Sequence, residues 1–286
     1  MARIITPEAE EFLDKEFRVL DHGFVRLIDY MGGDDAIIQA ARVSYGKGTK
    51  KVTEDRGLIR YLMRHRHTTP FEMVEFKFHV KLPIFVARQW IRHRSANVNE
   101  YSGRYSVMKE EFFVPESGDI RFQSSVNKQG RSEEEVPVEL KRKFVDFLNN
   151  LHKSSYEAYQ EFVEAGLARE LARIALPLSL YTEWYWKIDL HNLFHFLALR
   201  MDDHAQKEIR DYAVKMADMV KAVCPMAYEA FMDYRVNAAY FSGPELAIAN
   251  DRLAGWDITE EQLRERGLSK REASEFLDKL RRIKSR

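Results

Sequence analysis

The chain has 286 residues, 45% hydrophobic and 31% charged, which is enough for one large or two small domains with a sizeable core. Its 45 basic residues balance 45 acidic ones, and this neutrality argues against a general nucleic-acid binder, which carries a basic excess. The single cysteine, Cys224, excludes an internal disulfide, and the sequence shows neither a signal-peptide core nor an apolar run of membrane-spanning length, so we expect a cytoplasmic protein without a membrane partner.

The N-terminal part of the chain alternates predicted helices and strands. Thr6 followed by Pro7 is typical of a helix start, and apolar spacing predicts further helices over 34–44 and up to about residue 67. Residues 17–30 are expected to form two strands joined by a turn at 21–23. Residues 74–82 alternate apolar and polar side chains and give the clearest strand signal in the chain.

The second half is dominated by long helices. A helix is expected to begin at Pro83 and to carry Gln89 and Arg92 on one face, and a polar surface loop is expected over 123–137. Apolar spacing then predicts the following elements in order: a helix over 144–166, an aromatic strand over 180–188, a short helix over 189–200 with Asp189 as its N-cap, and a helix over 205–223. Together these elements predict an α+β fold with a mainly antiparallel sheet packed by long helices.

The character of the sequence changes after about residue 240. A break at 241–244 is followed by two short, highly charged helical patterns. We therefore expect a main domain over 1–240 and a helical C-terminal appendage of unknown role over 241–286.

The most informative segment spans residues 92–104. Arg92, His93, Arg94 and Arg104 place cations around the carboxylate of Glu100, and the segment also contains two Asn amides and two serine hydroxyls. Arginine forks match phosphate and carboxylate oxygens, whereas a carboxylate accepts from ribose hydroxyls or ring N–H groups. The combination indicates a site for an anionic ligand that also carries hydrogen-bond donors.

This segment resembles the R-H-R-x-x-S-x-N-E-x-S-x-R signature of the flavin-dependent thymidylate synthases, with Asn97 in place of the usual serine. The segment at 67–72 is similar to that family's H-x-T-P-F-E motif. The resemblance implies methylation of dUMP to dTMP, with methylenetetrahydrofolate and NADPH as co-substrates and FAD as cofactor. It also implies a homotetramer with active sites at the subunit interfaces.

The resemblance assigns the site residue by residue. The expected FAD contacts are Ser44, His67, Thr69, Arg92, His93, Arg94, Glu100, Asp189, Leu190, His191 and His195. The expected dUMP contacts are Gln89, Trp90, Ile91, Arg92, Glu100, Tyr101, Ser102, Gly103, Arg104, Arg173 and Arg200. Arg200 is expected to be catalytic, because a fixed guanidinium at the uracil edge would stabilise an N3 anion that makes C5 nucleophilic.

Several other interpretations remain open on sequence alone. A non-catalytic nucleotide-binding regulatory module would carry the same arginines, and Arg173 and Arg200 could instead pair with internal carboxylates. Ser102 would need a nearby base to act as a nucleophile. His191 and His195 have the spacing of a helical metal pair but no obvious third ligand, so no metal is expected.

Overall fold

The computed structural model describes residues 5–43, 52–126, 128–253 and 257–284. The chain divides into two compact units, Met1–Val236 and Asn237–Arg286. The first unit ends close to position 240, the domain boundary expected from the sequence. Within the described ranges, none of the helices is both long and apolar enough to cross a membrane.

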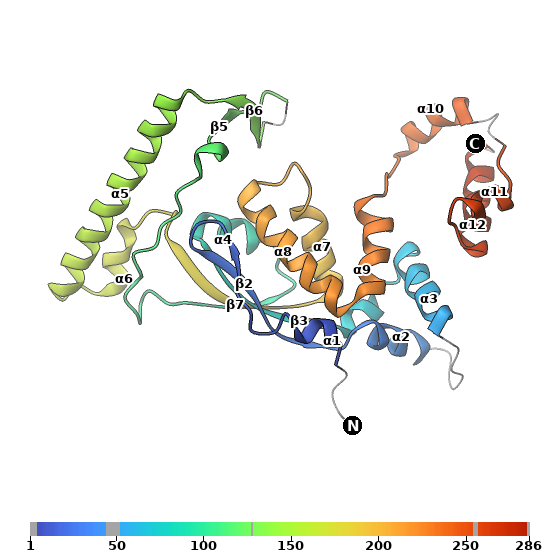
Figure 1. Cartoon of the computed structure of the whole chain (residues 1–286), viewed down its shortest axis with the longest axis horizontal. Helices are drawn as coiled ribbons and strands as arrows, with labels where there is room; N and C mark the ends of the chain where they lie inside the picture. Colours follow the sequence, from blue (N-terminus) through green and yellow to red (C-terminus); the bar gives the residue numbers. More distant parts are fainter. Residues whose placement is uncertain (1–4, 44–51, 127, 254–256, 285–286) are drawn as a thin grey trace. The chain divides into compact units, whose positions relative to one another are not determined.

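An antiparallel five-stranded sheet forms the centre of the first unit (Figure 1). Its strand order is β1 (Phe17–Val19), β2 (Gly23–Met31), β3 (Glu75–Pro83), β7 (Tyr181–Asp189) and β4 (Asn97–Glu100). All four neighbouring pairs are antiparallel. The turn between β1 and β2 and the strand predicted from alternation at 74–82 are therefore confirmed, as is the α+β class.

Helices cover the apolar face of this sheet. The helices of the first unit are α1 (Pro7–Glu10), α2 (Asp34–Val43), α3 (Val52–Arg64), α4 (Ile84–Trp90), α5 (Val138–Glu164), α6 (Arg169–Ala172), α7 (Leu190–Arg200), α8 (Lys207–Val223) and α9 (Pro225–Phe231). Phe76, Phe78, Trp184 and Trp186 are buried on the covered face, where α4, α7 and α8 contact the strands. This burial of large aromatic side chains fixes the ends of α4 and α7 relative to the sheet.

Strand β7 passes directly into α7, and Asp189 makes the transition. Its Oδ1 accepts from the main-chain N–H of Asn192 at 2.9 Å, and its Oδ2 accepts from the Asn192 side chain at 2.7 Å. Asp189 is thus the predicted N-cap, which satisfies a helix N–H that has no partner within the helix. The cap sets where α7 begins and hence where Arg200, its last residue, lies.

Two sequence expectations need correction. The segment 123–137 is not simply a loop, because β5 (Arg121–Gln123) and β6 (Arg131–Glu135) form a hairpin. The acidic run in β6 hid this strand, since main-chain pairing here needs no apolar alternation. Helix α4 also ends at Trp90, so Arg92 lies beyond it, although the Arg92 N–H still donates to the Gln89 carbonyl at 3.3 Å.

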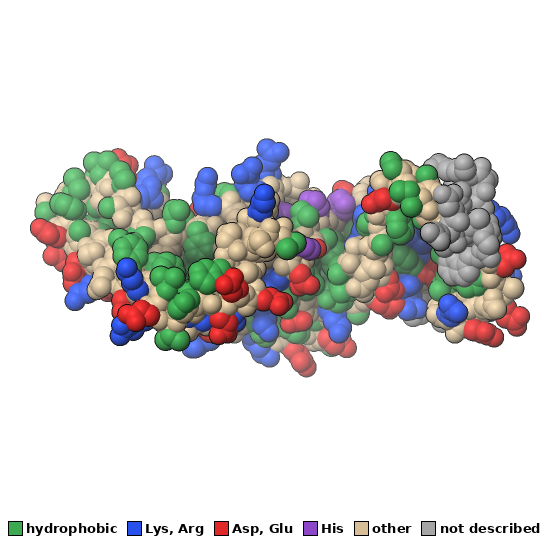
Figure 2. Space-filling model, turned by 90° about the horizontal axis from the view of Figure 1, so that it is seen from above, with side chains coloured by type: hydrophobic (Ala, Val, Ile, Leu, Met, Phe, Trp, Pro, Cys, Tyr) green, Lys and Arg blue, Asp and Glu red, His purple; other side chains and the backbone are tan. Residues whose placement is uncertain are grey.

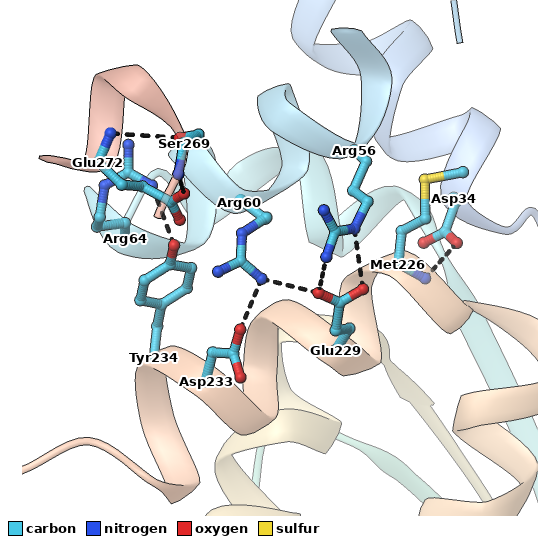
Figure 3. A network of polar contacts seen from close by, with 10 residues as sticks. All are labelled: Asp34, Arg56, Arg60, Arg64, Met226, Glu229, Asp233, Tyr234, Ser269 and Glu272. Carbon is cyan, nitrogen blue, oxygen red and sulfur yellow. Dashed lines mark hydrogen bonds and ion pairs between the residues drawn. The ribbon is translucent and has the colours of Figure 1, made fainter. Parts of the chain in front are cut away.

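A polar network joins α3 and the N-terminus of α2 to the segment formed by α9 and the π-helical turn Met232–Val236 (Figure 3). Arg60 Nη1 donates to Glu229 at 2.9 Å and to Asp233 at 2.6 Å, and Arg56 Nε donates to Glu229 at 3.0 Å. The buried Asp34 carboxylate accepts from the main-chain N–H groups of Met226 and Ala227, which belong to the first turn of α9. Asp34 therefore caps α9 from a distant part of the chain.

The second unit is a small helical assembly of α10 (Gly243–Leu253), α11 (Glu260–Glu265) and α12 (Lys270–Lys284). Thr259 and Gln262 form a capping box at the start of α11. Leu263, Ala273 and Leu280 are its buried apolar side chains. The two predicted helices are present, and α10 is a third that the break at 241–244 concealed.

Candidate functional site

Three residues predicted for the site meet where α4 and α7 end. Arg200 Nε donates to Nε2 of His93 at 3.0 Å, and Arg200 Nη2 donates to the main-chain oxygen of Gln89 at 3.5 Å. The guanidinium is partly buried, and burial lowers its pKa. No described carboxylate pairs with Arg200, so the alternative of an internal ion pair is wrong for this residue. Two contacts thus fix one edge of a cationic fork and leave its other donors available.

His93 is held in its neutral form. Burial, and then the nearby charges of Arg200 and His195, lower the pKa of His93 from 6.5 to about 4. Its Nε2 accepts the Arg200 hydrogen bond, so the ring proton lies on Nδ1. His93 therefore orients Arg200 without competing with it as a second cation.

Acid is expected to destabilise the protein through His93 between about pH 6.5 and pH 4. The unfolded chain takes up this proton near pH 6.5, whereas the folded protein takes it up only near pH 4, so stability is lost as the pH falls through that window. His93→Gln keeps an acceptor for Arg200 but cannot titrate. Urea midpoints at pH 7 and pH 5 should therefore differ less in His93→Gln than in the wild type, and an unchanged difference would show that His93 does not carry this acid sensitivity.

Several arginines of the site lack acidic partners. Arg92, Arg94 and Arg173 make no side-chain hydrogen bond or ion pair with any residue in the described ranges. Among the described residues, the Arg104 side chain contacts only Tyr105, whose ring lies 5.4 Å from its guanidinium carbon. By contrast, the arginines of the α3–α9 network are each paired with carboxylates. A set of exposed, unpaired guanidinium groups is suited to an anionic ligand such as a phosphate.

Gly103 brings the signature loop against Arg173. A Cβ atom at this buried position would lie 2.7 Å from Met108 Sδ and 3.2 Å from Arg173 Cδ, so only glycine fits without displacement. Arg173 belongs to the short turn Arg173–Ala175, about 70 positions away in sequence. The Tyr101 N–H donates to the Glu183 carbonyl at 2.8 Å and ties the loop to β7. The predicted dUMP contacts in the loop and Arg173 therefore share one surface.

Glu100 and Ser102 each accept one hydrogen bond from within the protein. Glu100 Oε1 accepts from Thr182 Oγ1 at 2.8 Å, which leaves its second oxygen for a ligand. Ser102 Oγ accepts from the Arg104 main-chain N–H at 3.4 Å, and no base contacts it among the described residues. The geometry supports Ser102 as a polar contact and gives no support to a nucleophile.

A cavity of about 120 Å³ lies beside this cluster, between the C-terminal part of α3, the segment after it, α7 and α9. Its lining is Leu62, Met63, Arg66, His67, Thr68, Phe71, His191, Phe194, His195, Ala198, Phe231 and Arg235. Figure 2 shows histidine side chains gathered at the surface of the chain. Aromatic walls with imidazole and guanidinium donors fit a planar ring system bearing carbonyl, N–H and phosphate groups, as in a flavin dinucleotide.

Several predicted ligand contacts lie outside both the Arg200 cluster and the signature loop. Trp90 and Leu190 are fully buried, so their side chains belong to the core and only their main chains remain for a ligand. Ile91 is exposed, Thr69 lies next to the cavity-lining Thr68, and the Asp189 carboxylate caps α7. Ser44 falls outside the described residues. The ligand roles of these residues stay predictions.

Sequence reasoning missed three residues at the site. Gln206 accepts a hydrogen bond from the Gln89 side chain, and Arg66 and Arg235 line the cavity. Arg66 adjoins His67 and could have been found by its position, whereas Gln206 and Arg235 carry no local signal. His191 and His195 line the same cavity, but in the described part of the chain no three His, Cys, Asp or Glu side chains are grouped as for a metal ion.

Known proteins match the part of the chain that carries these site residues. Residues 26–226 match the family model of the thymidylate synthase complementing protein, Thy1. A flavin-dependent thymidylate synthase from Treponema denticola is 56% identical over 269 residues, which cover 94% of this chain and 98% of that relative. The chain belongs to the flavin-dependent thymidylate synthase family.

Other relatives of this flavin-dependent thymidylate synthase family extend the match. A flavin-dependent thymidylate synthase from Ehrlichia ruminantium (strain Gardel) is 53% identical over 278 residues, or 97% of this chain and 92% of that relative, so the alignment reaches into the C-terminal unit. Among solved structures, the UMP/dUMP methylase PolB from Streptomyces cacaoi bound with 5-Br dUMP matches with a TM-score of 0.70 and 32% identity, covering 77% of this chain and 99% of that one.

Cys224 is expected to be dispensable for the chemistry of this flavin-dependent thymidylate synthase family member. It is fully buried at the start of α9, burial raises the pKa of its thiol well above the usual value, and it does not line the cavity. Cys224→Ala should therefore keep methyl transfer activity and lower the melting temperature only slightly, because few atoms are removed. Loss of dTMP formation at an unchanged melting temperature would instead indicate a thiol nucleophile.

Proposed function

We propose that this chain is a flavin-dependent thymidylate synthase that converts dUMP, methylenetetrahydrofolate and NADPH to dTMP, tetrahydrofolate and NADP, with FAD as cofactor. The observation that carries the proposal is the convergence of Arg200, His93 and Gln89 next to Arg92 and Arg94, which have no acidic partner among the described residues. The relatives named as flavin-dependent thymidylate synthases and the solved dUMP methylase support the same reaction. None of these relatives favours a non-catalytic regulatory module.

Arg200 would act on the uracil ring. Arg200 Nε and Nη2 each donate one hydrogen bond to a protein acceptor, so the remaining N–H groups of the guanidinium can face the ring edge. A guanidinium fixed in a partly buried position stabilises negative charge on uracil N3, and that charge makes C5 nucleophilic. Because His93 stays neutral, no second cation weakens this orientation.

The nucleotide phosphate would lie against the signature loop. Arg104 and Arg173 supply cations, and Gly103 lets the main chain approach the ligand closely where a Cβ atom would collide with Met108. Ser102 and the second oxygen of Glu100 add polar contacts. The same face therefore offers both phosphate donors and an acceptor for sugar or ring donors.

Arg104→Ala is expected to weaken dUMP binding by about tenfold to a hundredfold, as for loss of one charge-assisted hydrogen bond. The Arg104 side chain is exposed and contacts only Tyr105 in the described part of the chain, so the fold should persist. Calorimetric titration of dUMP measures the change, and Arg142→Ala on the exposed side of α5 is a matched control for loss of one positive charge. Equal affinities in Arg104→Ala and the control would remove Arg104 from the phosphate site.

FAD would be held by the residues that line the cavity and by the exposed signature arginines. His67, His191 and His195 offer ring contacts, and Arg92 and Arg94 offer donors for a diphosphate. When bound, FAD supplies the hydride and one-carbon transfer chemistry. The protein residues orient the ligands, hold Arg200 at the uracil edge and, through the apolar wall of Phe71, Phe194 and Phe231, limit access of water.

A homotetramer with shared active sites fits the surface of the chain. The cavity of about 120 Å³ is smaller than the roughly 300–1,000 Å³ of complete small-molecule sites, so other surfaces must complete it. Helix α5 exposes Phe144, Phe147 and Phe162, with exposed fractions of 43%, 60% and 50%. Figure 2 shows hydrophobic side chains gathered over the part of the first unit that carries α5 and α6. Apolar surface of this extent indicates a protein interface, and light scattering over a range of concentrations tests the assembly.

Tritium release tests the reaction itself. With FAD, NADPH and methylenetetrahydrofolate present, dUMP labelled at C5 should lose its tritium as dTMP forms, because the C5 proton leaves when the methyl group is installed. Binding of dUMP without tritium release under any combination of these reactants would contradict the enzyme and support a nucleotide-binding module.

A further inference from the structure

A chain of hydrogen bonds runs from Gln89 to the β5–β6 hairpin. The Gln89 Nε2 group donates to Gln206 Oε1, and Gln206 Nε2 donates to Glu208 Oε2 at 2.8 Å. The other Glu208 oxygen is ion-paired with Nη2 of Arg131, in strand β6. Four side chains from α4, the start of α8 and β6 are thus linked in series, and the first of them lies directly beside Arg200.

The hydrogen-bonding chemistry of these linked side chains fixes which end of each amide group, oxygen or NH₂, points toward its neighbour. An ionised carboxylate only accepts hydrogen bonds, so Gln206 must turn its NH₂ group toward Glu208. The Gln206 carbonyl oxygen then faces Gln89, so Gln89 must donate to it from its own NH₂ group. The Gln89 Oε1 atom is left at the open end, with no hydrogen-bond partner among the residues that the structure describes. A charge two side chains away therefore decides that Gln89 presents an acceptor.

Burial makes this arrangement hard to change. The Glu208 side chain is 2% exposed, whereas that of Arg131 is 34% exposed. A buried carboxylate is costly unless it is paired, so the ion pair with Arg131 holds Glu208 in place. Neither Arg131 nor Glu208 touches the cavity or the signature loop, and both would otherwise look like ordinary structural residues.

We infer that Glu208, held by Arg131 and acting through Gln206, is a positioning residue that makes Gln89 an acceptor for an N–H or O–H group of the bound nucleotide. The inference rests on the proposed function in one respect, that the ligand beside Arg200 is dUMP. It assigns to the β5–β6 hairpin a role in nucleotide recognition through the ion pair of Arg131 with Glu208.

Glu208→Gln tests the polarity directly. Arg131 still needs an acceptor, so the new amide turns its oxygen to Arg131 and its NH₂ group to Gln206, which reverses both following amides and makes Gln89 a donor. Gln206→Leu is the second variant, because it interrupts the chain and leaves the ion pair intact. In FAD-loaded protein, each variant should raise the calorimetric Kd for dUMP by about threefold to tenfold, the size expected for one neutral hydrogen bond.

A double-mutant cycle separates positioning from a general loss of structure. If Glu208 acts through Gln89, then Glu208→Gln or Gln206→Leu added to Gln89→Ala should change the dUMP Kd by less than about twofold. Lys207→Met is the matched control, because Lys207 lies on the same turn of α8 and pairs with Asp119 and Asp211 outside the chain of hydrogen bonds. It should leave the Kd unchanged.

The possible results of these titrations distinguish failure of the positioning role from failure of the proposed function. Additive effects in the Gln89→Ala background, or an unchanged Kd in Gln206→Leu, would overturn the positioning role and leave the proposed function in place. A wild-type protein that retains FAD but does not bind dUMP would instead contradict the proposed function. A Kd change in Gln206→Leu that disappears in the Gln89→Ala background supports the inference even where Glu208→Gln folds poorly.

Discussion

Arg200→Ala is expected to retain FAD binding and reduction of the flavin by NADPH while methyl transfer falls by about a hundredfold or more. Flavin reduction depends on the residues that hold FAD, whereas methyl transfer also needs the uracil ring to be activated. Arg200 is fixed by His93 and by the Gln89 carbonyl, so its fork is already oriented before the ligand binds. Loss of a preorganised donor at a developing charge affects the transition state far more than the ground state.

Arg200→Lys should recover only part of the activity. An ammonium group restores the positive charge but cannot hold His93, the Gln89 carbonyl and the uracil edge at once, because it lacks the planar fork. Stopped-flow absorbance separates flavin reduction from the subsequent oxidation that accompanies methyl transfer. A fall of both half-reactions by the same factor would assign Arg200 to cofactor placement.

Asp34→Ala is expected to lower the free energy of unfolding by about 2–4 kcal/mol at pH 7, through loss of two charge-assisted hydrogen bonds. The carboxylate accepts from Met226 at 2.8 Å and Ala227 at 3.0 Å, and both N–H groups lie at the positive end of α9. Asp35→Ala is the matched control, because Asp35 is exposed in the same turn of α2 and should change stability little.

The effect of Asp34 should depend on pH. Burial, the largest influence, raises the pKa of Asp34 from 3.8 to about 6 in the folded protein. The stability that this titration contributes is complete below pH 3.8 and is lost as the pH rises through about 6. Urea titrations should therefore show a larger difference between the wild type and Asp34→Ala at pH 5 than at pH 7. A difference that shrinks on acidification would contradict a folded-state pKa of Asp34 that burial raises.

The sequence was informative where a local rule decides the structure. Alternation located β3, the side chain of Asp189 located the start of α7, and the signature located exposed arginines that have no acidic partner among the described residues. The hairpin β5–β6 escaped because β5 is only three residues long and β6 is charged on both faces. The contact of Arg200 with His93 spans 107 positions and depends on the pairing of β3 with β7, which no local pattern encodes. Gln206 was missed for the same reason.

The signature segment is secured at its start and in its centre. It leaves the buried C-terminus of α4, and its central part pairs with β7 as strand β4, from Asn97 to Glu100. The following residue, Tyr101, is bonded to the Glu183 carbonyl. The conformational entropy of the signature segment is therefore lost during folding, before any nucleotide binds. Little of the binding free energy is then needed to order this loop. A one-residue insertion between Arg94 and Asn97 would shift the register of β4 and turn each of its side chains to the opposite face of the sheet.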